Sequence, residues 1–346
     1  MSESAMDKLH LPPVRDKKIG SWRFAAGRIR SLEVNLFRKS GLDRLFHAEE
    51  LQDLRLLLQE HRYPQDDFAE ALKKERIAVY DLLQEIAPQD AYRVALLVFA
   101  DVHNLKFMLK ENLKDSSKRS FDEMSHLLMK PSLADPAQVY ELISGVGDKS
   151  AAQPWITELI DLGEKAYYDT YEVAAIDRAL DKKAHMIAAE LADDLGNDWF
   201  IRYFALQRDL INLETFFRVR HRALSETTYK ESLLPEGLIS EQEWQELYGA
   251  EDERISEVLN KVGYGVFEPY METYGASGEA ARFVRDRDQV LIDHIESGRH
   301  FLSGPELTLS YVLAREFEIK NLRIVDAAIR NRLHLEQRNA LRRDLW

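Results

Sequence analysis

The sequence contains no cysteine, only 15 glycines and 10 prolines among 346 residues, and no long apolar run. Without cysteine the chain can form no disulfide, no thiolate nucleophile and no Cys-ligated zinc site. No apolar stretch reaches the roughly 18 residues that a membrane-spanning helix needs, so the sequence predicts no such span. The first residues lack the apolar segment of a secretory signal, and we expect none. These absences favour a protein of a reducing compartment.

Positive charge is also in short supply. The chain has 47 Lys and Arg against 60 Asp and Glu, which gives a net charge of -13. A nucleic-acid-binding protein usually carries the opposite sign, so no nucleic-acid partner is expected. The basic residues gather at the ends, where residues 1–40 hold nine against four acidic ones and residues 311–346 hold eight against five. This distribution fits either a solvated helical surface or a field that orients a docking partner.

Apolar residues recur at helical spacing along most of the chain. Leu51, Leu54, Leu57 and Leu58 form one such stripe, and similar stripes cover residues 72–86, 96–109 and 309–325. Alternation with period two is nearly absent, and no Asn-Gly or Asp-Gly hairpin signal occurs. The pattern predicts an all-α fold, with a flexible tail over residues 1–17.

Helix-start signals support the same prediction. Asp135-Pro136 and Gly304-Pro305 have the pattern of an N-cap followed by proline in the first turn. Ser240 and Glu243 have the spacing of a capping box. Helices are therefore expected to begin at these three places.

One short motif occurs three times at nearly equal intervals. It consists of an acidic residue, two spacers and Asn-Leu, and the intervals are 108 and 109 residues. The copies are Asp101-Val-His-Asn104-Leu105, Asp209-Leu-Ile-Asn212-Leu213 and Glu318-Ile-Lys-Asn321-Leu322. Chance would give well under ~1 such spacing, so the motif indicates a unit of about 108 residues repeated in tandem.

The acid and the Asn of this motif share a helix face, because residues three apart are neighbours on a helix. Asn is a poor residue inside a helix, since its side chain competes for backbone hydrogen bonds. A structural interpretation is that each Asn satisfies a polar group where helices cross within its own lobe. A functional interpretation is that all three face a shared axis and touch a partner on it. The two interpretations are compatible.

Three other motifs resemble catalytic ones only weakly. Asp193-Asp194-Leu-Gly-Asn-Asp198 is similar to the aspartate-rich Mg²⁺ motif of all-α isoprenoid synthases, but Gly196 interrupts the helix between the acids. The Glu123–His126 pair lacks the second Glu-x-x-His of a di-iron bundle. The segment 145–150 lacks the four-residue spacer of a phosphate loop. No catalytic, metal or cofactor residue is therefore predicted.

Longer segments carry a family resemblance. Glu316-Phe-Glu318-Ile-Lys320-Asn321-Leu-Arg323-Ile and Trp22-Arg-Phe-Ala-Ala-Gly-Arg-Ile-Arg-Ser-Leu-Glu33 resemble segments of the central-stalk C subunit of V/A-type rotary ATPases, whose eukaryotic counterpart is called d. Leu233-Leu-Pro-Glu236-Gly-Leu-Ile-Ser240 is similar to that family's Leu-Pro-Gly-Gly linker, with Glu236 in place of the first Gly. Together with the three motif helices, these segments extend the resemblance over most of the chain.

The resemblance implies a funnel of three similar helical lobes around a pseudo-threefold axis. The repeat would place the lobes at residues 18–127, 128–236 and 237–346. In a closed ring of repeats, the N-terminal helix can complete the last lobe, so these boundaries stay open.

The resemblance also implies a function. The family's funnel is a non-catalytic rotor adaptor that transmits torque for proton or sodium transport. Its partners are the shaft subunits D and F and the proteolipid ring of the membrane rotor, and it lies on the cytoplasmic face without inserting. Two alternatives stay open at this point, an all-α Mg²⁺-dependent enzyme of the isoprenoid type and a helical-repeat scaffold.

Twelve residues are predicted to bind partners, on the strength of the three motifs and the basic residues beside them. They are Asp101, Asn104, Lys106, Asp209, Asn212, Arg218, Arg220, Arg222, Glu318, Lys320, Asn321 and Arg323. The run from Arg218 to Arg222 fits either a helix C-terminus or an acidic shaft. Glu214 departs from the pattern, since the other repeats carry Lys106 and Arg323 at its position.

Overall fold

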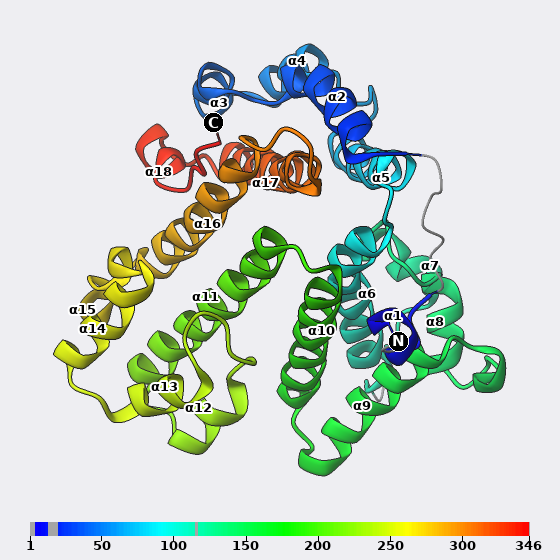
Figure 1. The fold of residues 1–346 in the computed structure, drawn as a ribbon, viewed down its shortest axis with the longest axis vertical. Coiled ribbons are helices and arrows are strands. Elements are labelled where there is room, and N and C mark those ends of the chain that lie inside the picture. Colours follow the sequence, from blue (N-terminus) through cyan, green and yellow to red (C-terminus); the bar gives the residue numbers. More distant parts are fainter. Residues whose placement is uncertain (1–3, 13–19, 115–116, 346) are drawn as a thin grey trace. The chain divides into compact units, whose positions relative to one another are not determined.

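The computed structural model describes residues 4–12, 20–114 and 117–345. Within these ranges every regular element is a helix, and no strand occurs there (Figure 1). The predicted all-α class is therefore confirmed. No helix in the described part of the chain has an apolar stretch long enough to cross a bilayer.

The chain divides into two compact units that alternate along the sequence. The first comprises Met1–Asp16, Gln89–Arg208 and Lys230–Gly237, and the second comprises Lys17–Pro88, Asp209–Tyr229 and Leu238–Trp346. The N-terminal residues from 17 to 88 thus fold with the C-terminal part of the chain. The three lobes drawn from the repeat remain a prediction.

The first unit is built around a long helical hairpin. Its helices are α1 (Ala5–Lys8), α6 (Ala91–Asn112), α7 (Phe121–Met124), α8 (Pro136–Ile143), α9 (Pro154–Thr170), α10 (Val173–Leu195) and the first part of α11 (Asp198–Arg222), with 3-10 turns η2 (Ser125–Leu127) and η3 (Lys149–Ala151). Helix α10 packs along both α6 and α9. Asp135 caps α8 as predicted, because its side chain accepts a hydrogen bond from the Ala137 N–H.

Helix α9 crosses its neighbours closely at Gly163. A Cβ atom on this residue would lie 2.6 Å from Cδ1 of Leu109 and 3.3 Å from Cδ1 of Leu180. Leu109 lies on α6 and Leu180 on α10, and both side chains are buried. The absence of a side chain at position 163 therefore sets how closely three helices approach one another.

Part of the segment expected to be a flexible tail is helical. Helix α1 packs against α10, and the Ala5 N–H donates to the Asp194 carboxylate at 3.3 Å. Ala5, Met6 and Leu11 are buried. The remaining tail residues, 1–3 and 13–17, lie outside the described residues.

The second unit gathers its helices around α17. They are α2 (Trp22–Leu32), α3 (Lys39–Phe46), α4 (Leu51–Glu60), α5 (Phe68–Ile86), the rest of α11, α13 (Glu241–Glu246), α14 (Asp252–Val262), α15 (Tyr270–Thr273), α16 (Glu279–Gly298), α17 (Pro305–Arg330) and α18 (Leu335–Asn339), with 3-10 turns η1 (Glu33–Asn35), η4 (Leu247–Gly249) and η5 (Gly265–Phe267). Helix α12 (Glu226–Ser232) begins in this unit and ends in the first. Helix starts at Pro305 and after Ser240 confirm the two remaining cap predictions.

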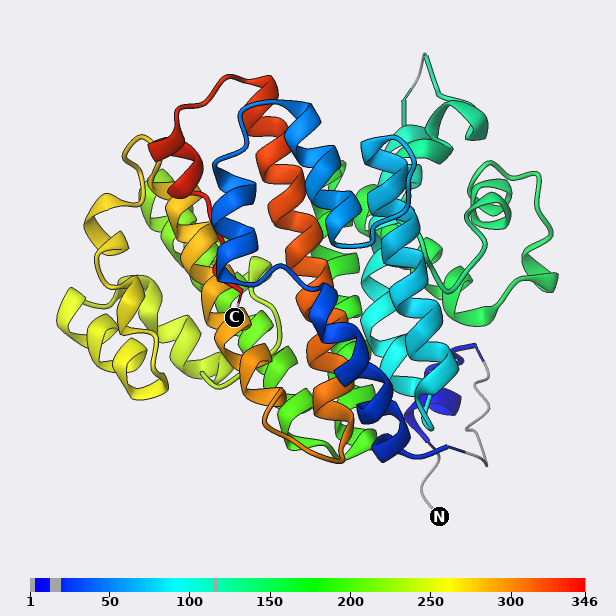
Figure 2. The ribbon, with the colours of Figure 1, turned by 90° about the horizontal axis from the view of Figure 1, so that it is seen from above.

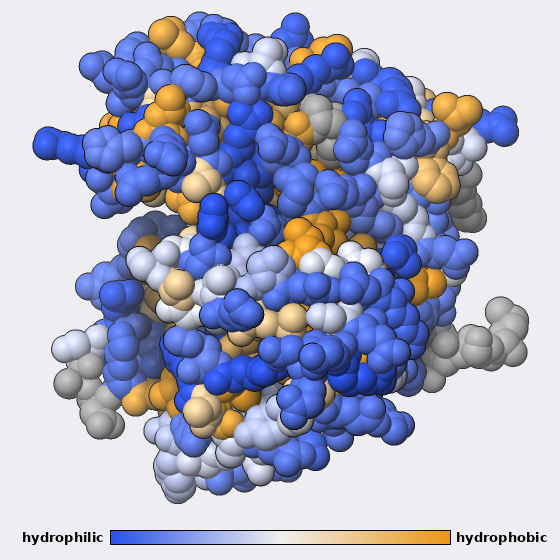
Figure 3. All heavy atoms as spheres, turned by 90° about the vertical axis from the view of Figure 1, so that its left-hand side faces the viewer, coloured by the Kyte–Doolittle hydropathy of each residue, from blue (hydrophilic) through white to orange (hydrophobic). Residues whose placement is uncertain are grey.

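Helix α17 is buried along most of its length because neighbours cover it on several sides. Figure 2 shows α16 and α5 flanking it and α2, α3 and α4 across it, and all five contact it. Leu322 and Val325 of α17 pack with Leu45 and Phe46 of α3 in a core cluster of this unit. Apolar side chains are thereby removed from the surface, and the face drawn in Figure 3 is mainly hydrophilic.

We expect Gly163→Ala to destabilise the protein by about 1–3 kcal/mol, because the new methyl group overpacks the contact with Leu109. Gly27→Ala is the matched control. Gly27 also lies inside a helix, but a Cβ atom there would meet nothing within 4 Å. This control should gain up to about 1 kcal/mol from helix propensity. Chemical denaturation of both variants measures the difference, and equal effects would contradict the close crossing.

Candidate functional site

The first copy of the repeated motif holds a downstream loop. The Asp101 carboxylate accepts hydrogen bonds from the N–H groups of Leu133 and Ala134, both at 2.8 Å. The Asn104 side chain makes two bonds to the Met129 backbone, donating to its carbonyl at 3.0 Å and accepting from its N–H at 2.7 Å. Both motif side chains are buried. We call this arrangement a backbone clamp.

The second copy makes a similar clamp. The Asp209 carboxylate accepts from the Leu238 N–H at 2.7 Å and from the Ile239 N–H at 3.3 Å. Trp244 Nε1 and the Tyr264 hydroxyl also donate to it, at 3.3 and 3.1 Å. The carboxylate and Asn212 are both fully buried. One side chain thus fixes a loop and two aromatic residues.

The third copy clamps segments from both ends of the chain. Glu318 accepts from the Phe37 N–H and from the Tyr63 hydroxyl, each at 2.6 Å, and pairs with Arg315. Asn321 donates to the Arg343 carbonyl at 2.9 Å and accepts from its N–H at 3.2 Å. The acids of the first two copies bind loops 29–33 residues downstream. Glu318 binds the N-terminal part of the chain instead.

Burial changes the protonation of these groups. It raises the pKa of Asp101 to about 7, against the opposing effect of the Ala134 and Leu133 N–H groups. It raises the pKa of Asp209 to about 6 in the same way. Burial, and then the Glu318 charge, raises the pKa of Tyr63 well above its usual value, so this hydroxyl stays protonated and donates.

The six motif residues among the predicted partner contacts are therefore interior. Asp101 is 5% exposed and Asn104 2%, whereas the corresponding residues of the other two copies are fully buried. The hydrogen bonds of Asn104 and Asn321 agree with the structural interpretation of the motif. A contact of these six with a partner stays a prediction.

In the first two motif copies, the residue two positions after the Asn forms an ion pair. This pairing explains why Glu214 is acidic where the first copy has the basic residue Lys106. Lys106 pairs with Asp181 of α10 at 2.5 Å, whereas Glu214 pairs with Arg287 of α16. The two pairs span 75 and 73 residues, so their second members lie two positions apart in the repeat, and their charges are exchanged. The sign change at position 214 is thus matched by a sign change in its partner.

Lys320 and Arg323 have different environments. Lys320 lies 2.5 Å from Asp288, a buried carboxylate that also accepts from Arg343 Nε at 2.8 Å. Burial lowers the pKa of Lys320, and the Asp288 charge opposes this effect. Arg323 is exposed on the following turn of α17. Sequence reasoning treated the two as equivalent and missed Asp288, since its partner residues come from separate segments.

The basic run at the end of α11 is exposed. Arg218 pairs with Glu214 at 2.6 Å, and Arg220 pairs with Asp252 of α14 at 3.0 Å. Arg222 lies in the last turn, where positive charge favours the negative end of the helix dipole. These three residues are on the surface and accessible to a partner.

The weak catalytic motifs occupy ordinary structural positions. Gly196 ends α10 in a left-handed conformation with φ 62°, and Asp198 opens α11. The aspartate-rich segment is therefore a turn between two helices. No group of three potential metal ligands occurs among the described residues.

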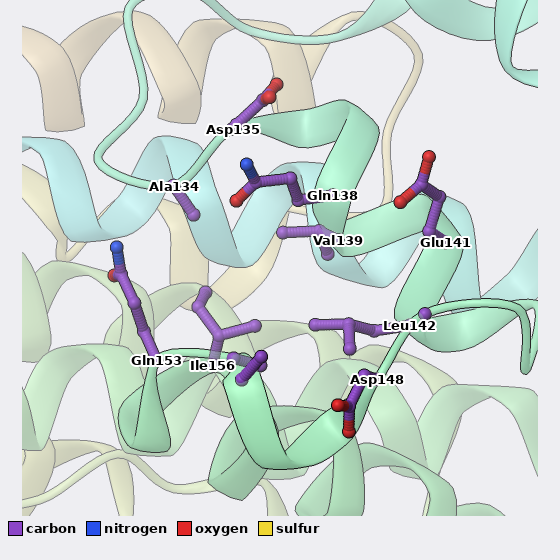
Figure 4. A pocket seen from close by; sticks show the side chains of 12 residues that line it. Ala134, Asp135, Gln138, Val139, Glu141, Leu142, Asp148, Gln153 and Ile156 are labelled. Atoms are coloured by element: carbon purple, nitrogen blue, oxygen red, sulfur yellow. The ribbon is translucent and has the colours of Figure 1, made fainter.

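A cavity of about 380 Å³ lies between α8, η3 and the start of α9 (Figure 4). Val139, Leu142 and Ile156 point toward one another in it, while Asp135 turns its carboxylate away from them. Asp148 accepts two hydrogen bonds from Ser150, which lower its pKa. The lining is otherwise apolar or carries carboxylates and carboxamides, and we assign no chemistry to it.

The fold and the clamps define the class of protein. It is an all-α chain in which a helical motif recurs at even spacing and ties the backbone of its own unit together. Comparison with known families then gives the particular assignment: the chain belongs to the ATP synthase (C/AC39) subunit family, which matches residues 25–341.

Two relatives agree with this assignment, and both are described as the C subunit of an A-type ATP synthase. The one from Methanothermobacter thermautotrophicus is 24% identical over 327 residues, which cover 86% of this chain and 81% of the relative. The one from Methanosarcina acetivorans is 24% identical over 340 residues, which cover 90% and 89%. The similarity therefore extends over nearly the full length of both.

We expect Asp101→Asn to destabilise the protein by about 1–3 kcal/mol, because the amide nitrogen would face a backbone N–H that needs an acceptor. The raised pKa of Asp101 means that the native state binds more protons than the unfolded state between about pH 4 and about pH 7. Stability from this group is therefore present at low pH and is lost as the pH rises. The gap between wild type and variant should narrow across this range in denaturation at several pH values. A gap that widens would contradict the assignment.

The exchanged charge pair gives a second test. Glu214→Lys alone should cost about 1–2 kcal/mol, because it places two cations together between α11 and α16. The double variant Glu214→Lys with Arg287→Asp restores opposite charges and should recover part of the loss, with a coupling of about 0.5–3 kcal/mol. A double-mutant cycle measures this coupling. Additive losses would show that the pair makes no direct contact.

Proposed function

We propose that this chain is a non-catalytic rotor adaptor of a V/A-type ATPase or ATP synthase. It joins the central shaft, made of subunits D and F, to the proteolipid ring of the membrane rotor and transmits torque for proton or sodium transport. It lies on the cytoplasmic face as a peripheral protein. The observation that carries this proposal is the family match over residues 25–341.

The clamps support a mechanical role. A shaft adaptor must resist twisting, and its weakest parts are the loops between helices. Each clamp ties such a segment to a long helix through a buried acid. Buried hydrogen bonds to a charged group are stronger than neutral ones and are costly to break. Loops held this way pass load between helices with little deformation.

Surface charge supplies candidate contacts. Arg218, Arg220, Arg222 and Arg323 are exposed, and basic side chains of this kind steer and orient an acidic partner. The motif acids and asparagines would support these contacts from below by fixing the helices that carry them. All twelve predicted residues are part of this proposal, the six buried motif residues by positioning the helices and the other six by contact with the partner.

Affinity capture from native membranes tests the proposal. The tagged full-length chain should recover the shaft subunits and the rotor ring together. Recovery of neither would overturn the adaptor role. Magnesium-dependent release of diphosphate from an allylic substrate would instead revive the enzyme alternative.

Single charge reversals test the surface. We expect Arg323→Glu to weaken recovery of the partners and to reduce coupling of ATP hydrolysis to ion pumping, with the free energy of unfolding changed by no more than about 0.5 kcal/mol. Lys320→Glu should instead destabilise the chain by about 1–3 kcal/mol, because it faces the buried Asp288. Circular dichroism melting separates the two effects.

Arg55→Glu is the matched control, since Arg55 is an exposed arginine on α4 of the same unit. It makes the same charge change and should leave recovery and coupling intact. Full coupling in Arg323→Glu would remove Arg323 from the interface.

A further inference from the structure

A cavity beside the end of α17 is rich in basic side chains. It has a volume of about 350 Å³ and belongs entirely to the second unit. Its lining residues are His47, Glu49, Ile329, Arg332, Leu333, His334, Leu335 and Arg338. Four of these eight are basic and one is acidic, in a chain whose net charge is -13. The cavity is therefore richer in basic than in acidic side chains, although the chain as a whole is acidic.

Arg338 shapes this cavity. Its Nε donates to the Leu333 carbonyl at 2.8 Å, and its Nη1 donates to the Ala48 carbonyl. The second bond connects α18 to the segment that follows α3, and Figures 1 and 2 both show these two helices side by side. A guanidinium group has five N–H donors, so three remain for a further acceptor.

Arg332 lies at the rim in an uncommon backbone conformation. Its φ is 54°, in the left-handed region where glycine usually ends a helix. The side chain is exposed, and within the described part of the chain it forms no ion pair. The Arg332 guanidinium is thus available to a ligand, unlike most of the arginines described above.

The two histidines have defined hydrogen-bonding roles. Nδ1 of His47 lies 2.7 Å from the Asp43 carbonyl, which only accepts, so this nitrogen carries the hydrogen. The His334 backbone N–H donates to the Gln337 side-chain oxygen at 3.0 Å where α18 begins. The His334 imidazole carries at least one N–H, which can donate to a ligand. An anion in the cavity would meet donors from Arg332, Arg338 and His334.

Basic residues near a helix C-terminus have a common structural explanation, because they interact with the last carbonyls and the helix dipole. That explanation accounts for Arg338, which bonds two carbonyls. It does not account for Arg332, for which no such bond is found in the described structure. The apolar residues Ile329, Leu333 and Leu335 add a second kind of surface to the same cavity.

We propose that this cavity binds a phosphate ester. The phosphate group is held by Arg332, Arg338 and His334, and the organic part lies against Ile329, Leu333 and Leu335. The cavity is larger than a bare phosphate needs, and planar guanidinium donors suit phosphate oxygens. Glu49 offers an acceptor for a hydroxyl group of the ester. The same chemistry is found in soluble phosphate esters and in phospholipid headgroups.

Calorimetric titration of the full-length chain with glycerol 3-phosphate tests the site. We expect saturable binding of one equivalent, weakened about tenfold or more by Arg332→Gly, because a charge-assisted bond is lost. Glycine suits the left-handed backbone, so this variant should melt no lower than wild type. Loss of binding in it is then not a consequence of unfolding.

Arg62→Gly is the matched control. Arg62 follows α4 with φ 60°, and it is exposed and absent from the cavity lining. The same substitution in the same backbone conformation should leave binding unchanged. Equal loss of affinity in both variants, or a wild-type chain that binds neither glycerol 3-phosphate nor the phosphatidylglycerol vesicles described below, would overturn the proposal.

Vesicle sedimentation distinguishes the two sources of phosphate. The probes are phosphatidylcholine vesicles with and without phosphatidylglycerol. Phosphatidylglycerol-dependent binding that Arg332→Gly abolishes supports a headgroup site. Binding of glycerol 3-phosphate without vesicle binding supports a soluble ester. Vesicle binding that persists in Arg332→Gly, with no response to glycerol 3-phosphate, contradicts the site.

Discussion

The structure depends on buried carboxylates that accept hydrogen bonds from backbone N–H groups. Asp101, Asp209 and Glu318 each lie inside a long helix and hold a segment distant in sequence. Moving the loops would leave these buried carboxyl groups without hydrogen-bond partners, which is costly, so the acids disfavour rearrangement of the loops they bind.

Within each motif helix, the buried acid and Asn have a different role from the charged residue that follows them. The acid and the Asn face inward because they share one side of the helix, and the following basic or acidic residue reaches a neighbouring helix. In two repeats this reach ends in an ion pair whose signs are exchanged, Lys106 with Asp181 and Glu214 with Arg287. Both repeats thus carry an ion pair at this residue, with opposite signs and with second members at slightly different repeat positions.

The adaptor role proposed above would need both of these features. Loops held by buried acids would pass on force, and exposed residues such as Arg323 and Arg222 could change to match a partner without altering the core. The basic cavity at the end of α17 lies apart from the clamps in the second unit, since it is formed by residues 47–49 and 329–338. The ligand proposed for it would bind at the end of a motif helix, since Ile329 belongs to α17, and would touch neither Glu318 nor Asn321.

The sequence by itself determined the all-α class and the positions of the three motifs, because helical periodicity and tandem spacing are local signals that survive in one chain. It could not determine what each motif binds. Backbone N–H groups are present at every residue, so nothing in the sequence marks Leu133, Leu238 or Phe37 as their partners. Tertiary structure also decided that Lys320 meets Asp288, and that His47 joins Arg332 in one cavity, because only folding brings such distant segments together.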